Sequence, residues 1–108
     1  MAFNVTGLTL IHQASPVNLW CYDTADATGV VDGTDYFAGM SAPAATSKGM
    51  NVGDMVLVRI WTTAVPATTA AKNAANPADA AWHMVRAIDA DGNATLAAET
   101  AIVVAAGA

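Results

Sequence analysis

Hydrophobic and polar positions alternate with a period of two along most of the chain, which is the pattern of half-buried β-strands. Turn-forming residues separate these short segments, and no period of 3.6 residues is sustained between them. Gly7 interrupts the first segment and is a candidate β-bulge. The pattern predicts strands at residues 3–14, 17–22, 55–62, 82–88, 94–96 and 101–104.

Strands joined by short polar turns are typical of an antiparallel barrel or sandwich. The chain is therefore predicted to be one all-β domain over residues 1–108, built as a small antiparallel barrel or sandwich. Residues 55–62 are apolar on both faces, so we expect this strand at the centre of the sheet or covered on both sides. Tyr36 and Phe37 form either a short strand or an aromatic anchor, followed by a loop at 38–49.

Residues 63–81 depart from the alternating pattern, because they are rich in alanine and separate two predicted strands. Long connections of this kind are usually functional or mobile. We expect a loop insertion in which Asn76 caps a helical turn, with Pro77 at the first helical position. Two interpretations stay open: a solvated insertion, or an arm that reaches a neighbouring subunit.

Charged residues make up only 12% of the 108 residues, whereas 55% are hydrophobic and the mean hydropathy is +0.40. A typical globular chain has about 25% charged residues. So few charges cannot cover the exterior of a small domain. We therefore expect part of its surface to lie against a partner in the working state.

The net charge of −5 argues against nucleic acid as the partner, since phosphate binding requires a basic patch. Lys48, Arg59, Lys72 and Arg86 are scattered along the chain, which also argues against docking on an anionic membrane. The N-terminus lacks the basic region and apolar run of a secretory signal, and no apolar run approaches the ~20 residues that span a bilayer. Folding in a cytoplasm is expected.

Residues suited to catalysis are few. The one cysteine, Cys21, excludes an internal disulfide and is interpreted as a small core residue. His12 and His83 each lie in a strand pattern, without a Gly-x-Ser-x-Gly or a phosphate-binding glycine motif elsewhere in the chain. We therefore predict no enzymatic activity and no cofactor. The alternative is a small hydrolase or ligand-binding barrel that uses His12 or His83.

A metal site is also not predicted. Residues 89–92 are similar to a calcium loop, but the positions of the glycine and the closing ligand fit neither possible register, so a hairpin turn is the better interpretation. Asp23, Asp26, Asp32 and Asp35 would bind a cation if the fold brought them together. We favour the interpretation that several of them accept hydrogen bonds from their own turns.

The three tryptophans, Trp20, Trp61 and Trp82, lie in apolar strand patterns. Aromatic side chains on strands can stack on sugars or bases. Tryptophans in apolar patterns are more often anchors of a core or of a subunit interface, and we favour that interpretation.

The chain resembles a family of small all-β structural proteins from the virions of tailed bacteriophages. The resemblance rests on an aromatic strand, a Thr-x-Asp turn, a valine, a Tyr-Phe pair and a Gly-Asp turn before an apolar strand. Residues 82–96 match the family's strand–turn–strand in outline, whereas the insertion at 63–81 is a departure. The residues that carry the resemblance are Trp20, Tyr22, Thr24, Asp26, Val30, Tyr36, Phe37, Gly53, Asp54 and residues 56–58.

The resemblance implies a non-enzymatic capsid decoration, or cement, protein that binds the outer lattice of the major capsid protein and stabilises the head. It would be made in the host cytoplasm and lie on the capsid surface, as a homotrimer suited to threefold positions of the shell. The alternative is a head-fibre, spike or tail component with an adhesive or glycan-binding role. The candidate interface residues are Phe3, Trp61, Pro66 and Pro77.

Overall fold

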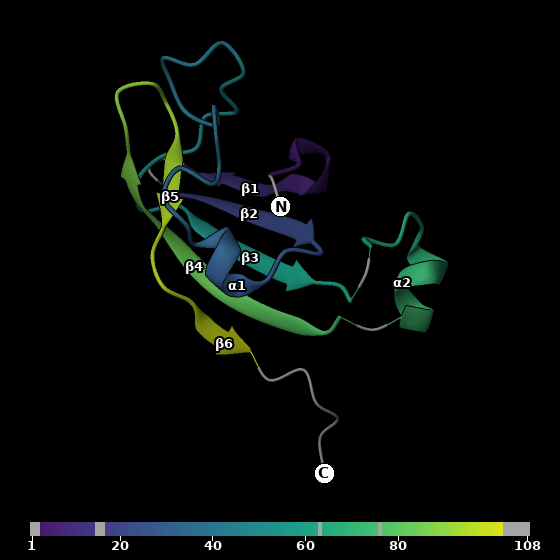
Figure 1. Ribbon diagram of the computed structural model, residues 1–108. Helices are drawn as coiled ribbons and strands as arrows, with labels where there is room; N and C mark the ends of the chain where they lie inside the picture. Colours follow the sequence, from purple (N-terminus) through teal and green to yellow (C-terminus); the bar gives the residue numbers. More distant parts are fainter. Residues whose placement is uncertain (1–2, 15–16, 63, 76, 103–108) are drawn as a thin grey trace.

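The computed structural model describes residues 3–14, 17–62, 64–75 and 77–102. It consists of a strongly curved β-sheet with one layer of loops against its inner face (Figure 1). The all-β class predicted from the alternating pattern is confirmed. Within the described ranges, no helix is long and apolar enough to cross a membrane. The elements are η1 (Val5–Gly7), β1 (Leu8–Ala14), β2 (Val17–Thr24), α1 (Thr28–Val31), β3 (Met55–Ile60), α2 (Thr69–Ala75), β4 (Asp79–Ile88), β5 (Ala94–Leu96) and β6 (Thr100–Ile102).

The strand order is β1-β2-β3-β4-β5, and β6 pairs with the first half of β4. The pairs are antiparallel except for β2 and β3, which run parallel from Leu19 opposite Met55 to Thr24 opposite Ile60. The sheet is therefore mixed and is not closed into a barrel, whereas the prediction was an antiparallel barrel or sandwich. The reason is the long crossover at 25–54, which returns the chain to the end of the sheet where β2 began.

The first strand is shorter than predicted. It begins at Leu8, because Asn4 caps a 3-10 turn over Val5–Gly7 by accepting a hydrogen bond from the backbone N–H of Thr6. The bulge lies between Leu10 and His12 and not at Gly7. The break predicted between the first two strands, at residues 15–16, and the predicted end of the last strand, at 103–104, lie outside the described residues.

The alanine-rich segment is not entirely loop. It contains α2, where the hydroxyl of Thr68 accepts a hydrogen bond from the backbone N–H of Ala71, and β4 begins at Asp79. The predicted helical turn at Pro77 is wrong, since the helix lies before this proline; Asn76 is outside the described residues. α2 contributes no buried side chain, so the helix is not part of the core.

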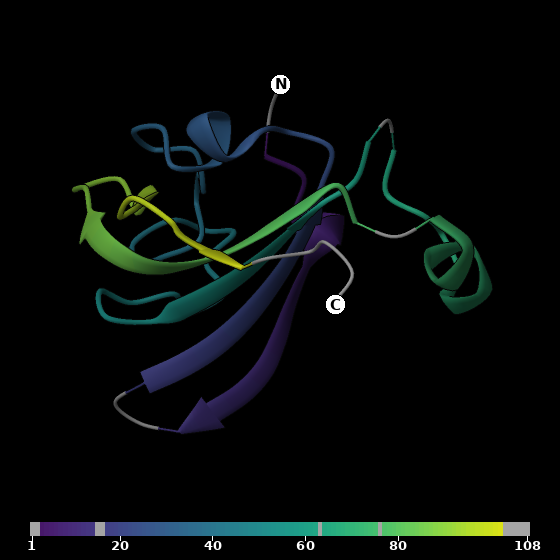
Figure 2. The ribbon, with the colours of Figure 1, turned by 90° about the horizontal axis from the view of Figure 1, so that it is seen from below.

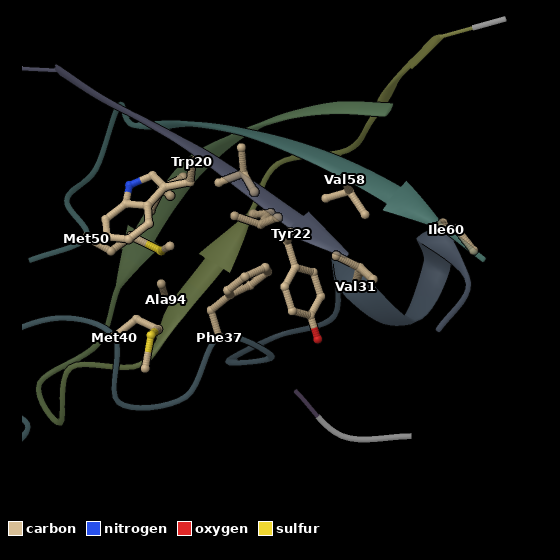
Figure 3. Packing of buried hydrophobic residues seen from close by; sticks show 12 residues of the cluster. Trp20, Tyr22, Val31, Phe37, Met40, Met50, Val58, Ile60 and Ala94 are labelled. Carbon is tan, nitrogen blue, oxygen red and sulfur yellow. The ribbon is translucent and has the colours of Figure 1, made fainter. Parts of the chain in front are cut away.

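The core lies between the inner face of the sheet and the crossover at 25–54. Alternate residues of β2, β3 and β4 point inward, and Figure 3 shows those of β2 and β3 reaching toward Phe37 and Met40 of the crossover. Phe37 also forms an isolated β-bridge with Ala94, which connects the crossover to β5. The buried cluster consists of Trp20, Tyr22, Val31, Phe37, Met40, Met50, Val56, Val58, Ile60, Val85, Ala94 and Leu96.

Candidate interaction surface

Two of the residues that carry the phage resemblance meet at a buried carboxylate. Asp54 is 0% exposed, and the indole N–H of Trp20 donates to its Oδ2 at 3.1 Å. The backbone N–H and the side-chain amide of Asn18 also donate to this carboxylate, at 3.2 and 3.3 Å. The backbone N–H of Asn51 donates at 2.9 Å and closes the turn through Gly53. These contacts fix the turn before β3 to the start of β2.

Four other resemblance residues form a second hydrogen-bonded group. The hydroxyls of Tyr22 and Tyr36 are 2.8 Å apart, and the Tyr36 hydroxyl donates to Oδ2 of Asp26. The hydroxyl of Thr24 accepts from the backbone N–H of Asp26 at 2.9 Å. Burial, followed by the hydrogen bond to Asp26, raises the pKa of Tyr36 above its ordinary value, so the hydroxyl stays protonated and can donate. This group ties the end of β2 to the crossover.

Phe3, a candidate interface residue, packs on this aromatic group. Its ring centroid lies 5.3 Å from that of Tyr22 and 4.8 Å from that of Phe37. Most of the resemblance residues therefore lie on the inner side of the sheet, where their contacts stabilise the fold. The exceptions are Leu57, which lies on the opposite face, and Val30, which is exposed on α1. A surface for a partner has to be sought elsewhere.

The opposite face of the sheet carries two rows of apolar side chains. One row joins Leu19, Met55 and Met84 across β2, β3 and β4, and the next joins Cys21, Leu57 and Trp82. All six side chains keep part of their surface exposed, and Met84 is 45% exposed. In β3, by contrast, the inward residues Val56, Val58 and Ile60 are buried. We call these six residues the outer apolar face.

The loops and α1 lie on the other side of the sheet from this face (Figure 2). β3 is central, as expected from its apolar residues, but it is covered on one side only by the described part of the chain. Cys21 was expected in the core and is instead half-buried on the outer apolar face. Burial raises the pKa of this thiol, which keeps it in the less reactive protonated form.

A charged group borders the outer apolar face at the ends of β2 and β3. Arg59 donates hydrogen bonds from Nε and Nη2 to the carboxylate of Asp23, at 2.7 and 2.8 Å, in a bidentate pair. The indole N–H of Trp61 and Nζ of Lys72 donate to the same carboxylate, each at 3.1 Å. Lys72 thereby connects α2 to the sheet. Trp61, a candidate interface residue, is buried in this group.

The Asp23 group predicts a loss of stability in acid. Burial raises the pKa of Asp23, but the hydrogen bonds from Arg59, Trp61 and Lys72 outweigh burial and hold the pKa below its ordinary value. A carboxylate with a lowered folded-state pKa stabilises the protein above its unfolded-state pKa of about 3.9. That stabilisation is lost as the pH falls through the folded-state value. We therefore expect the free energy of unfolding to decrease below about pH 4.

Urea denaturation of the wild type and of Asp23→Asn, at a series of pH values, tests this expectation. At neutral pH the variant should lose about 1 kcal/mol, because water screens the partly exposed Arg59 and Lys72. Below pH 4 the two stability curves should approach each other. Asp89, whose pKa is lowered by hydrogen bonds from Asn93, is present in both proteins and cancels in the comparison. A constant gap between the curves down to the lowest pH would contradict the assignment.

Three of the four aspartates considered as metal ligands have separate partners. Asp23 binds two cationic side chains, Asp26 accepts from Tyr36, and Asp35 contacts the hydroxyl of Thr95. In the described ranges no three His, Cys, Asp or Glu residues form a group suited to a metal. The residues at 89–92 form the predicted turn, in which Asp89 accepts hydrogen bonds from the backbone of Asp91 and Asn93.

The two histidines lie in unlike places. His12 is exposed on β1, whereas His83 is buried on β4, with Nδ1 2.9 Å from the carbonyl oxygen of Ala97. His83 pairs with Val56 across the sheet. The hydrogen bonds of the described residues do not join either histidine to a nucleophile and a carboxylate, which is the arrangement that nucleophilic catalysis requires.

Pockets lie on both sides of the N-terminal strand. A polar pocket of about 510 Å³ lies between β1 and the segment before α2, and includes Pro66, Asp23 and Lys72 in its wall. Two apolar pockets of about 460 and 400 Å³ lie beside η1 and share Val5 and Lys48. Pro77, the remaining candidate interface residue, is half-buried before β4 and lines none of these three pockets.

Comparison of the chain with protein-family models, with curated proteins and with solved structures gives no match. The phage resemblance therefore stays a prediction. Sequence patterning alone did not single out the outer apolar face or the pairing of Asp23 with Arg59. The sequence signal for the outer apolar face was the apolar content of both faces of residues 55–62. Asp23 and Arg59 become neighbours only through the register of β2 and β3.

Proposed function

We propose that this protein is a non-enzymatic structural component of a virion, and that it acts as a capsid decoration protein. Its outer apolar face would dock on the outer lattice of the major capsid protein. The observation that carries the proposal is this face: six apolar side chains in two rows across three strands, partly exposed and opposite to the covered core. An exposed apolar surface on a small protein indicates a binding surface.

The chemistry of the face suits a repeating protein partner. Burial of apolar area contributes about 25 cal/mol per Å² before the costs of association. Five large side chains and Cys21 supply such area without a charged residue among them. Methionine adapts its shape to a contact, and both Met55 and Met84 lie in the same row. The bordering Asp23 group places polar residues at the rim, as in known protein interfaces.

The acidic character of the chain is consistent with this role. A net charge of −5 gives the particle surface no affinity for free nucleic acid. We place the working protein on the capsid surface, after synthesis in the host cytoplasm. The resemblance also implies a homotrimer, but docking through this face does not require one, and the molar mass in solution tests the trimer separately.

The first test is the ratio of this chain to the major capsid protein in purified particles, measured by quantitative mass spectrometry. A ratio near one, or a simple fraction of it, is expected for a lattice-wide decoration role. A few copies per particle would indicate a fibre, spike or tail. Absence from the particle would overturn the proposal.

The docking face is tested by Leu57→Lys, which places a charge at the centre of the outer apolar face. Binding of the purified variant to particles that lack the protein should decrease at least about tenfold, because a charge would be buried without a partner. Val52→Lys is the matched control, since Val52 is 57% exposed and lies in the turn before β3. The variant's melting temperature has to stay near that of the wild type. Equal binding by both variants would exclude this face as the docking surface.

A glycan-binding role has one observation in its favour. Trp82 is partly exposed on the outer apolar face and could stack on a sugar, whereas Trp20 and Trp61 are buried. Binding to a glycan array that Trp82→Ala abolishes would favour this role over the decoration role.

A further inference from the structure

We infer that two copies of this chain associate through the free edge of β1, antiparallel and about a two-fold axis at Ile11. β1 is the terminal strand of the sheet, and no residue of the described ranges pairs with its outer edge. An edge strand has backbone N–H and C=O groups that can pair with another chain. A two-fold axis lets two identical edges satisfy each other. This inference concerns a surface other than the outer apolar face and does not depend on the virion role.

The charge distribution favours a second copy as the occupant of this edge. The first charged residue in the chain is Asp23, so β1 and nearly all of β2 are uncharged at neutral pH. All nine acidic residues lie from Asp23 onward. Two copies with a net charge of −5 repel each other where their acidic surfaces meet, and this repulsion is weakest between the uncharged hairpins.

Exposed apolar side chains gather on the same flank. Ile11 is 52% exposed, and Leu10, Val17 and Val5 are also exposed. Figure 2 shows the β1–β2 hairpin extending beyond the layer of loops. Beside its inner side lie the two apolar pockets, one of which is lined by Leu8 and Leu10. A second β1 would place its own inward side chains next to these pockets and cover them.

The proposed axis falls at the middle of β1. Ile11 is the middle residue of Leu8–Ala14, and the bulge leaves it without a partner in β2. Pairing centred on Ile11 uses the full length of both strands and places Leu10 opposite His12 of the second copy. Of the features that protect the edges of many monomeric proteins, residues 8–14 have one bulge but no charged residue and no proline.

The expected assembly is a dimer, because pairing of two identical edges is complete with two copies. This distinguishes it from the trimer that the phage resemblance implies. Sedimentation equilibrium of the full chain over a range of micromolar concentrations measures the molar mass. A monomer at every concentration, or a trimer, would overturn the inference.

The edge itself is tested by Ile11→Lys, which brings two like charges together at the axis. We expect the dimer dissociation constant to rise at least about tenfold, since like charges directly opposite across strands are destabilising. Val30→Lys is the control: Val30 is an exposed valine on α1, on the loop layer, and its change adds the same charge. Circular dichroism confirms that both variants are folded. A dimer that persists in Ile11→Lys would also overturn the inference.

A cross-link tests the register without loss of binding. In a Cys21→Ser background, Ile11→Cys places two thiols opposite each other, where Cα atoms of paired antiparallel strands are about 4.5–5.5 Å apart. This separation permits a disulfide. We expect a disulfide-linked dimer after mild oxidation, and none from Val30→Cys in the same background. Equal cross-linking of the two variants would contradict pairing at Ile11. The copy number in virions does not enter any of these measurements, so the docking proposal can fail independently.

Discussion

Replacement of Asp54 by alanine is expected to lower the free energy of unfolding by about 3 kcal/mol or more, the largest effect among the substitutions considered. The carboxylate is fully buried and accepts four hydrogen bonds, two of them from Asn18 and the others from Trp20 and Asn51. Without it, the N–H groups of the buried residues Asn18 and Trp20 lose their acceptor, and each unsatisfied buried group costs about 1–3 kcal/mol. Since small domains have a total stability of about 5–15 kcal/mol, this loss brings the protein close to unfolding.

Urea denaturation followed by tryptophan fluorescence measures the effect. Asp54→Asn is the milder variant, because it keeps the size of the side chain and one acceptor oxygen but turns an amide toward the donors. Asp91→Ala is the control, an exposed aspartate in the hairpin turn whose backbone hydrogen bond to Asp89 does not need its own side chain. If Asp54→Ala were no less stable than Asp91→Ala, the structural role of the buried carboxylate would be refuted.

Gly92→Ala is the second substitution with a large expected effect. Gly92 has φ of +87°, and a Cβ atom built on it would lie 2.1 Å from the carbonyl oxygen of Ser41. The backbone N–H of Ser41 donates to the carbonyl of Gly92 at 3.0 Å, so the two segments cannot separate without losing this bond. A left-handed residue with a Cβ costs about 1–2 kcal/mol, and the clash adds to that cost. We expect a total loss of about 3 kcal/mol.

Gly53→Ala separates the two causes. Gly53 has φ of +94°, but nothing lies within 4 Å of its Cβ position, so this variant shows the cost of the backbone conformation alone. Thermal unfolding of both variants should give the larger decrease in melting temperature for Gly92→Ala. Equal decreases would mean that the loop at Ser41 moves away freely, and that the crossover is not held against the hairpin turn as the structure indicates.

The resemblance residues illustrate why a pattern of residue types does not reveal a site. Trp20 and Asp54 are far apart in the chain and were chosen as separate parts of a pattern, yet they form one buried hydrogen bond. Tyr22, Tyr36 and Asp26 likewise form one connected group. The spacing of these five residues reflects the requirements of the core, which is why none of the five lies on the outer apolar face. Phe3 and Trp61, chosen as interface residues for their size, are used by the fold in the same way. Leu57 is a resemblance residue that does lie on the outer apolar face.

The sequence by itself determined the properties that depend on neighbouring residues. The alternation of side chains located β2, β3, β4 and β5 to within a few residues, and turn-forming residues located the turn at 89–93. The absence of charge before Asp23 is likewise evident in the sequence. These features are local, because the direction of a side chain in a strand follows from the residues beside it.

The tertiary structure decided which strands pair and which face is covered. The crossover at 25–54 returns the chain so that β3 runs parallel to β2, and this register brings Arg59 to Asp23. The same crossover lies on one side of the sheet and leaves the apolar residues of the other side partly exposed. Both outcomes depend on contacts between residues distant in the chain. The period of two is identical for the two faces of a strand, so it could not show which face would be covered.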